Sequence, residues 1–220
     1  TLNVYGDICS GKSLFDCCER LARQGRYGEE GSDEKRRGCD FMWYLWCGRK
    51  SPLYGRDKMC VYTKYFEGKV EREEKDPYYE YVKSESYCLK VLAEFGADGK
   101  YSVIVNGHMP VKVKDGERPE SGNGRHIVID GGLSKAYHGK TGIAGYTLIN
   151  NSQGLYLVCH SPFSSIDDVV RRSADLKSEV HTLKTYDRRI LVKETDKGAE
   201  LAAQIEVLKL LLKEYYGFSV

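Results

Sequence analysis

The sequence predicts a mixed α/β fold of the α+β type, with helices first, short strands next and one long helix last. Apolar residues recur at helical spacing through most of the first hundred residues. After Gly96 the pattern changes to short apolar or alternating runs with turn residues between them. We expect a mostly helical part at residues 1–100, a β-rich part at 101–165 and a helical extension at 166–220.

The chain opens with a strand pattern that leads into a helix. Residues 2–5 alternate between apolar and polar side chains, as a half-exposed strand does. Helical spacing follows over residues 14–22, where Ser13 and Asp16 have the separation of a capping box. The charged, glycine-rich stretch of residues 25–38 predicts a solvated loop.

An aromatic block and a polar stretch come next. The block FMWYLWCGRKSPLYG predicts a buried helix that runs into a Ser-Pro turn, with Trp43 and Trp46 as core residues. The stretch EGKVEREEKDPYYE predicts a surface excursion. Within it, Pro77 is suited to the start of the following helix, because proline is tolerated in the first turn.

The second half of the chain predicts strands. NNSQG, between the last two apolar runs, predicts a hairpin turn. The four runs that we expect to form strands are YSVIVNG, HIVIDGG, GYTLINN and LYLVCHS.

The final run places Leu201, Ile205, Leu208 and Leu212 on one stripe of a helix. Such a stripe packs either on the core of its own chain or at a subunit seam. We expect core packing, and a homo-oligomer is the alternative.

Composition excludes several classes of protein. The net charge of +2 arises from 34 basic and 32 acidic side chains, so no strong basic field favours nucleic acid. No apolar run approaches the ~18 residues that cross a bilayer, and no leader pattern opens the chain. The eight cysteines lack paired metal spacing, which favours reduced thiols in a cytoplasmic protein. The start at Thr1, already in a strand pattern, indicates a fragment.

The stretch GDICSGKS, residues 6–13, fits the phosphate-binding pattern G-x-x-x-x-G-K-[ST]. In a nucleotide-binding fold the preceding strand lies inside a parallel sheet and is a nearly continuous run of Val, Ile and Leu. TLNVY alternates instead. We therefore favour a turn and helix start that carries Lys12, and keep nucleotide binding as a distant alternative.

A histidine at a strand end is the first candidate for chemistry. The apolar run VIV stops at Asn106-Gly107-His108, which places an imidazole beside a glycine that lets a ligand come close. This pattern suits a metal ligand. A strand-end histidine also serves as hydrogen-bonded structure, and the local sequence alone leaves both open.

Several long blocks carry a family resemblance. NGH-x-PVK, G-x-x-P, VIDGG-x-SKAY and TGIAGYTL follow one another in fixed order, after the block DFMWYLWCGRKSPLYGRDKM at residues 40–59. This order resembles the C-terminal portion of the class III fructose-1,6-bisphosphatases, a branch of the calcineurin-like metallophosphoesterases. The resemblance implies part of a metallophosphoesterase β-sandwich flanked by helices and incomplete at its N-terminus.

The same resemblance implies metal-dependent hydrolysis of fructose 1,6-bisphosphate to fructose 6-phosphate in gluconeogenesis, with divalent ions, usually including Mn²⁺. His108 matches the family's late G-H motif, so the resemblance implies that it is a metal ligand. The family's D-x-H, GD-x-x-D and GNH-[DE] motifs are not in this chain. We therefore expect the chain alone to be inactive. The alternative is a non-catalytic relative that binds sugar phosphate or a protein partner.

Cations and hydroxyl donors are expected to bind the substrate's phosphates. The candidates are Lys112, four residues past His108, Lys135 with Tyr137 in SKAY, and, more weakly, Arg56; a solvated surface role is the alternative for each cation. Met109 replaces the threonine common in the family, which predicts a loosened surrounding for His108. The other histidines have no motif support and are expected to be structural or exposed: His126, His138, His160 and His181.

Overall fold

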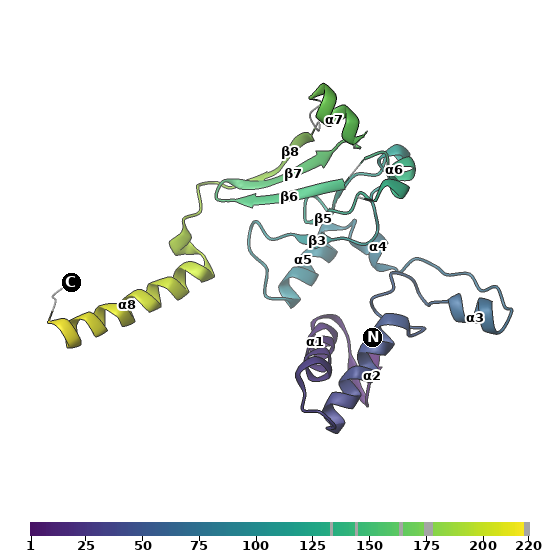
Figure 1. Ribbon diagram of the computed structural model, residues 1–220, viewed down its shortest axis with the longest axis horizontal. Coiled ribbons are helices and arrows are strands. Elements are labelled where there is room, and N and C mark those ends of the chain that lie inside the picture. Colours follow the sequence, from purple (N-terminus) through teal and green to yellow (C-terminus); the bar gives the residue numbers. More distant parts are fainter. Residues whose placement is uncertain (133, 144, 163–164, 174–177, 218–220) are drawn as a thin grey trace. The chain divides into compact units, whose positions relative to one another are not determined.

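The computed structural model describes residues 1–132, 134–143, 145–162, 165–173 and 178–217 of the chain. These residues form helices and several small sheets, so the mixed α/β fold is confirmed. The chain divides into two compact units, Thr1–Asp130 and Gly131–Val220. Most elements of both units are labelled in Figure 1.

The first unit begins with a hairpin and a pair of helices. The hairpin strands β1 (Leu2–Val4) and β2 (Asp7–Cys9) are antiparallel. The helices α1 (Gly11–Tyr27) and α2 (Asp33–Cys47) follow and pack on each other. A small apolar core joins these elements, because the buried side chains of both helices face the hairpin; it contains Val4, Cys9, Cys17, Leu21 and Phe41.

The solvated loop predicted for residues 25–38 is wrong, because both helices extend into it. Its glycines serve a helix crossing: a Cβ on Gly38 would lie 2.2 Å from the backbone nitrogen of Gly25. Only glycine lets the two backbones approach so closely. Most charged residues of the stretch lie on helix surfaces, and only Glu29 and Glu30 lie in the short connection at residues 28–32.

The predicted capping box is also displaced. Helix α1 begins one turn earlier than expected, so Ser10 is the N-cap and the box joins Ser10 to Ser13. The Ser10 amide donates to Ser13 Oγ at 3.0 Å. Asp16 instead forms an ion pair with Lys12.

The two tryptophans of α2 are not core residues in the described structure. Their exposed fractions are 63% for Trp43 and 71% for Trp46, and the two rings contact each other edge to face. Helix α2 buries its opposite side through Gly38 and Phe41. The aromatic run is therefore amphipathic at helical period, which a simple count of apolar residues does not reveal.

A long irregular segment then leads to a second helical pair. It contains α3 (Val61–Phe66), and Pro77 is the N-cap of α4 (Tyr78–Tyr81), which confirms the predicted helix start. The single helix expected after Pro77 is interrupted: the chain turns after Val82, and α5 (Glu85–Glu94) follows. Val82 is itself buried, at 2% exposure.

A three-stranded sheet completes the first unit. Its order is β3 (Ile104–Asn106), β5 (His126–Val128) and β4 (Glu120–Ser121), and a 3₁₀ turn, η1 (Val113–Asp115), lies between β3 and β4. Strands β3 and β5 are parallel, whereas β4 and β5 are antiparallel. Ile127 in the central strand is almost fully buried.

The second unit contains an antiparallel sheet whose strands lie side by side in the order β6, β7, β8 (Figure 1). The NNSQG hairpin is confirmed, because Asn151 and Gly154 are register partners across the turn. Strand β8 was not expected, since SEVHTLKT alternates only weakly. The elements of this unit are α6 (Lys135–Thr141), β6 (Gly145–Asn151), β7 (Gly154–His160), α7 (Ile166–Arg172), β8 (Ser178–Thr185), η2 (Val192–Glu194) and α8 (Asp196–Tyr216).

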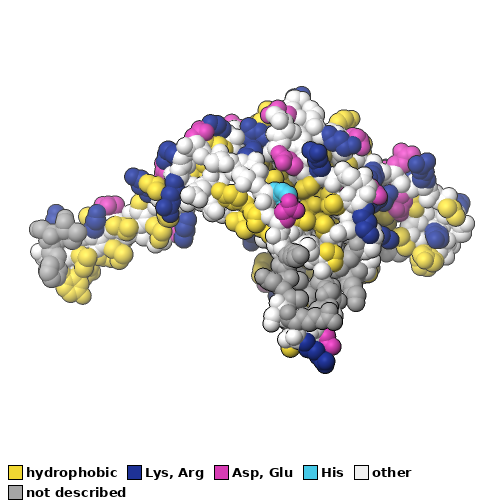
Figure 2. Space-filling model, turned by 90° about the horizontal axis from the view of Figure 1, so that it is seen from above, with side chains coloured by type: hydrophobic (Ala, Val, Ile, Leu, Met, Phe, Trp, Pro, Cys, Tyr) yellow, Lys and Arg dark blue, Asp and Glu magenta, His cyan; other side chains and the backbone are white. Residues whose placement is uncertain are grey.

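The final helix forms as predicted, but its stripe does not pack on a core. In α8 the exposed fractions are 39% for Leu201, 50% for Ile205, 58% for Leu208 and 41% for Leu212. Figure 2 shows hydrophobic side chains along this helix, at the left. The stripe is therefore not buried in a core of the second unit, as far as its described residues go. None of the described helices combines the length and apolarity needed to cross a membrane.

Candidate metal and substrate site

His108 lies in the loop that leaves β3. Its side chain is exposed, and its backbone φ of +71° is in the left-handed region. A residue other than glycine in that region carries a cost of roughly 1–3 kcal/mol and persists only where its surroundings hold it. The Met109 amide donates to the Gly107 carbonyl at 2.9 Å, which closes a tight turn around the histidine. His108 is thus presented to solvent by a constrained backbone.

The loop of His108 and the end of β5 lie at one edge of the sheet. Because β3 and β5 are parallel, their carboxyl ends meet there. The Ile129 amide donates to the Asn106 carbonyl at 2.9 Å, and the Val111 amide donates to the Asp130 carbonyl at 2.8 Å. Asp130 therefore leaves the sheet at the edge where His108 does, which is the usual place for ligands in parallel sheets.

A buried polar group lies behind this edge. His126 in β5 is 5% exposed, and both ring nitrogens have partners: Ser121 Oγ is 2.7 Å from Nδ1 and Asn106 Oδ1 is 2.7 Å from Nε2. The Tyr78 hydroxyl donates to the same Asn106 oxygen at 2.5 Å. Burial lowers the pKa of His126 and raises the pKa of Tyr78 to about 12, so both are neutral at pH 7.

Lys112 lies in the same loop as His108. Its side chain is exposed, while its backbone amide donates to a Glu117 carboxylate oxygen at 2.9 Å. Its carbonyl accepts from the Asp115 and Glu117 amides, which forms a compact turn that includes η1. The backbone of Lys112 is therefore fixed, and its ammonium group extends from a fixed point.

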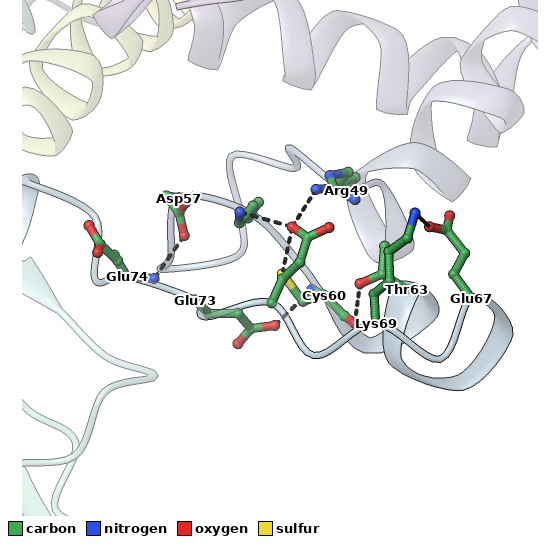
Figure 3. Close-up of polar contacts among 10 residues, drawn as sticks. Arg49, Asp57, Cys60, Thr63, Glu67, Lys69, Glu73 and Glu74 are labelled. Atoms are coloured by element: carbon green, nitrogen blue, oxygen red, sulfur yellow. Dashed lines mark hydrogen bonds and ion pairs between the residues drawn. The ribbon is translucent and has the colours of Figure 1, made fainter.

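Arg56 lies in the irregular segment before α4, which polar contacts hold together. Figure 3 shows this network, with Arg49, Cys60 and Glu73 drawn as sticks. Glu71 accepts from Arg49 at 2.7 Å and pairs with Lys58 at 2.9 Å, and these cations lower its pKa. A second carboxylate, that of Glu73, accepts from the Tyr54 hydroxyl at 2.6 Å and from the Cys60 amide at 2.8 Å.

The cations of this segment differ in whether they form ion pairs. Arg49 and Lys58 share Glu71, whereas within the described part of the chain Arg56 forms no ion pair with a carboxylate. Its backbone is fixed by a bridge to Lys75, and its side chain is half-buried. Arg56 therefore lies close to the Glu73 carboxylate, whose pKa it helps to lower, without an ion pair of its own among the described residues.

The remaining candidates belong to the second unit. Tyr137 is in α6, is 49% exposed, and packs against the backbone of Gly132, where a Cβ would lie 2.7 Å from Cβ of Tyr137. The side chains of Lys135 and His138 lie outside the described residues. The structure thus brings His108 and Lys112 together on one loop, and describes Arg56 and Tyr137 each within its own surroundings.

The GDICSGKS stretch has the structure of a hairpin and helix start, not of a nucleotide loop. Its strand pairs only within the β1–β2 hairpin, which is antiparallel. The Lys12 amide at the start of α1 donates to a Glu94 carboxylate oxygen at 2.8 Å, and the Lys12 ammonium pairs with Asp16 at 2.6 Å. Protein carboxylates occupy the donors that a phosphate would need.

The donor set fits a partial metal site. Across the described ranges, no group of three or more His, Cys, Asp or Glu side chains is placed to hold a metal ion. The exposed imidazole of His108 suits a divalent ion as a single ligand. All eight cysteines are free thiols, with Cys9, Cys17, Cys60 and Cys88 buried.

Sequence reasoning missed the residues that support His108. The Asn106-Gly107-His108 motif predicts no contact for the Asn106 side chain. For His126 the sequence predicts a structural or exposed residue and indicates no partner. A polar residue at a strand end, directly before Gly-His, is the signal that pointed to Asn106; nothing local pairs it with His126, 20 positions away.

A protein-family model matches nearly the whole chain. The model described as Firmicute fructose-1,6-bisphosphatase matches residues 1–217. No solved structure matches the chain.

Curated relatives carry related names. A fructose-1,6-bisphosphatase class 3 of Bacteroides thetaiotaomicron is 45% identical over 216 residues, which are 97% of this chain and 32% of the relative. A second, from Clostridium beijerinckii, is 46% identical over 217 residues, 98% of this chain and 33% of the relative. A third, from Clostridium botulinum strain Langeland, is 46% identical over 211 residues, which are 95% of this chain and 32% of the relative. The chain spans about a third of the length of these relatives.

Proposed function

This chain belongs to the Firmicute fructose-1,6-bisphosphatase family, and from that premise we propose that the longer protein containing it hydrolyses the 1-phosphate of fructose 1,6-bisphosphate in gluconeogenesis. The observation that carries the proposal is the match over residues 1–217, together with relatives at 45–46% identity that are named for this activity. We further propose the calcineurin-like metallophosphoesterase superfamily and a C-terminal position for this segment.

The role of this chain in the chemistry is to supply one metal ligand and a set of phosphate ligands. Bound divalent ions, which we propose to include Mn²⁺, polarise the phosphate and supply a hydroxide nucleophile. His108 is the proposed ligand, because its imidazole is exposed at a strand end and its backbone is constrained. The other ligands are proposed to lie in the remaining two thirds of the protein.

Lys112 and Arg56 are proposed to bind the substrate's phosphates. Lys112 extends from the loop that carries His108, so its charge is suited to the phosphate that is hydrolysed. Arg56 is suited to a bidentate contact, because neighbouring cations already share Glu71. Lys135 and Tyr137 are proposed as further phosphate ligands on the strength of the SKAY motif alone.

The cytoplasm is the proposed location, and a homo-oligomer is a further proposal, for which the exposed apolar stripe of α8 is the support. Analytical ultracentrifugation of the intact protein would test the oligomer.

Phosphate release by the purified intact protein tests the function. With Mn²⁺ present, fructose 1,6-bisphosphate should yield one phosphate and fructose 6-phosphate, and fructose 6-phosphate offered as substrate should yield little. The 220-residue chain alone should release none. An intact protein that binds the bisphosphate without releasing phosphate would favour the non-catalytic relative instead.

A further inference from the structure

A chain of partly buried hydrogen bonds ends next to His108. We propose that Tyr78, Asn106, His126 and Ser121 form a positioning network that fixes the orientation of His108 for metal binding. The inference rests on the proposed role of His108 as a metal ligand. None of the four is expected to touch the metal or the substrate.

The register of the sheet brings three of these residues together. Ser121 in β4 is the register partner of His126 in β5, and His126 is in turn the partner of Ile104 in β3. Asn106 lies two positions after Ile104, so its side chain is on the same face. Tyr78 from α4 covers that face, with its ring edge to face against His126 at 6.3 Å.

With Oδ1 of Asn106 facing Tyr78 and His126, the donors and acceptors of the network are complementary. Asn106 Oδ1 accepts the Tyr78 hydroxyl, and an amide oxygen cannot donate, so the proton of His126 is on Nε2. His126 Nδ1 is then an acceptor, and the Ser121 hydroxyl donates to it. Asn106 Oδ1 thus accepts from two donors at once, and the His126 ring has a partner at each nitrogen. These hydrogen bonds hold the Asn106 side chain in place.

The fixed position of Asn106 constrains the start of the loop that carries His108. Asn106 is the last residue of β3, and only Gly107 separates it from the histidine. Its carbonyl accepts the Ile129 amide, so side chain and main chain are both fixed at the point where the loop leaves the sheet. The left-handed backbone of His108 is unfavourable for a residue with a side chain, so it needs such support.

The order Ser121, His126, Asn106 resembles a nucleophile, base and orienting group, but the surroundings favour positioning. Ser121 Oγ is 3.4 Å from the Val82 carbonyl, and a Cβ on Gly122 would lie 2.8 Å from the Cys88 sulfur. The segment between α4 and α5 therefore covers Ser121. The hydroxyl completes the hydrogen bonding of the buried His126 ring.

Conservative variants of the intact protein test the network through Mn²⁺ affinity, measured from the free Mn²⁺ signal in electron paramagnetic resonance. Tyr78→Phe keeps the ring and removes one donor to Asn106. We expect the Kd for Mn²⁺ to rise about 10-fold, since residues that orient metal ligands are typically worth 10–100-fold in affinity. The kcat should fall with it, while the KM for fructose 1,6-bisphosphate stays the same. Tyr81→Phe, an exposed tyrosine of the same helix, is the matched control.

A pair of variants at His126 separates positioning from simple packing. Glutamine places an amide NH₂ near the position of Nε2 and so can still donate to Asn106, whereas leucine cannot. We expect His126→Gln to retain most of the Mn²⁺ affinity and His126→Leu to lose it. If Tyr78→Phe binds Mn²⁺ within twofold of the wild type, the positioning role is wrong, whatever its melting temperature.

His108→Ala, measured alongside, separates this inference from the proposed function. An unchanged Mn²⁺ affinity in His108→Ala would show that His108 is not a metal ligand. The proposed ligand role and the positioning network would then both be wrong. A weakened affinity there, with none in Tyr78→Phe, would overturn the network alone.

Discussion

Two glycine-containing segments of this chain look like ligand sites in the sequence, residues 6–13 and residues 106–112, and their structures differ. In the first, the amide and ammonium groups of Lys12 are taken by Glu94 and Asp16. In the second, His108 and Lys112 extend from a fixed backbone with exposed side chains. The comparison teaches that a motif becomes a site when its donors are left for a ligand, which spacing alone does not decide.

The largest effect should separate the two segments directly. We expect His108→Ala in the intact protein to lower kcat/KM for fructose 1,6-bisphosphate at least ~100-fold, because the proposed metal ligand is removed. Lys12→Ala should leave it unchanged, since Lys12 pairs only with its own helix neighbour on the surface. Steady-state phosphate release measures both. Equal losses in the two variants would contradict the comparison.

Arg56→Met should have the next largest effect. A charge-assisted hydrogen bond is worth about 1.5–3 kcal/mol, so we expect KM to rise roughly 10- to 100-fold. Arg49→Met is the matched control, because Arg49 is already paired with Glu71. Substrate saturation curves for both variants are the measurement, and a KM effect in Arg49→Met as large as that in Arg56→Met would count against a substrate role for Arg56.

The buried network behind the second segment predicts a pH dependence. Burial lowers the pKa of His126 below its ordinary value of 6.5. The neutral ring's contribution to stability is therefore complete above pH 6.5 and is lost as the pH falls through the lower folded pKa. We expect the melting temperature to fall between pH 6.5 and 5 in the wild type and to fall less in His126→Gln. Parallel curves over that window would contradict the assignment.

Protonation of Glu71 should cause a separate loss of folding stability at lower pH. Lys58 and Arg49 lower its pKa below 4.5, so its contribution to stability is present above pH 4.5 and lost below it. Glu71→Gln should remove this acid-side component and leave the step above pH 5 in place. A changed step above pH 5 in Glu71→Gln would show that the two components are not separate.

The smallest effect should come from uncovering the first segment. Glu94→Ala removes the carboxylate that accepts from the Lys12 amide, so we expect a fall in melting temperature of about 1–4 °C, as for the loss of a helix cap. ATP should stabilise neither form. Stabilisation of Glu94→Ala by ATP would mean that the segment is a concealed nucleotide site.

The fold was predictable where local pattern decides it. Strands at 104–106, 126–128, 145–151 and 154–160 follow from apolar runs, and the NNSQG hairpin follows from turn chemistry. Residues 25–38 misled because a stretch with four glycines usually indicates a loop, whereas here Gly25 and Gly38 allow α1 and α2 to cross. Trp43 and Trp46 misled because apolar character does not show which face of a helix is buried.

The candidate site was predictable only in part, for a different reason. His108 and Lys112 stand close together in the sequence, so one motif contains both. The partners of Asn106 lie 28 positions before it, at Tyr78, and 20 after it, at His126. Such contacts come from strand register, which no short window of sequence reports. The same holds for Arg56, whose lack of an ion pair among the described residues depends on Glu71 being taken by other cations.

The most direct test of the central claim is a crystal structure of the intact protein with Mn²⁺, with anomalous diffraction measured to locate the metal. We expect an anomalous peak within coordination distance of a ring nitrogen of His108, with Asn106 and His126 hydrogen-bonded to each other behind it. Manganese bound elsewhere, with the His108 ring free in solvent, would contradict it.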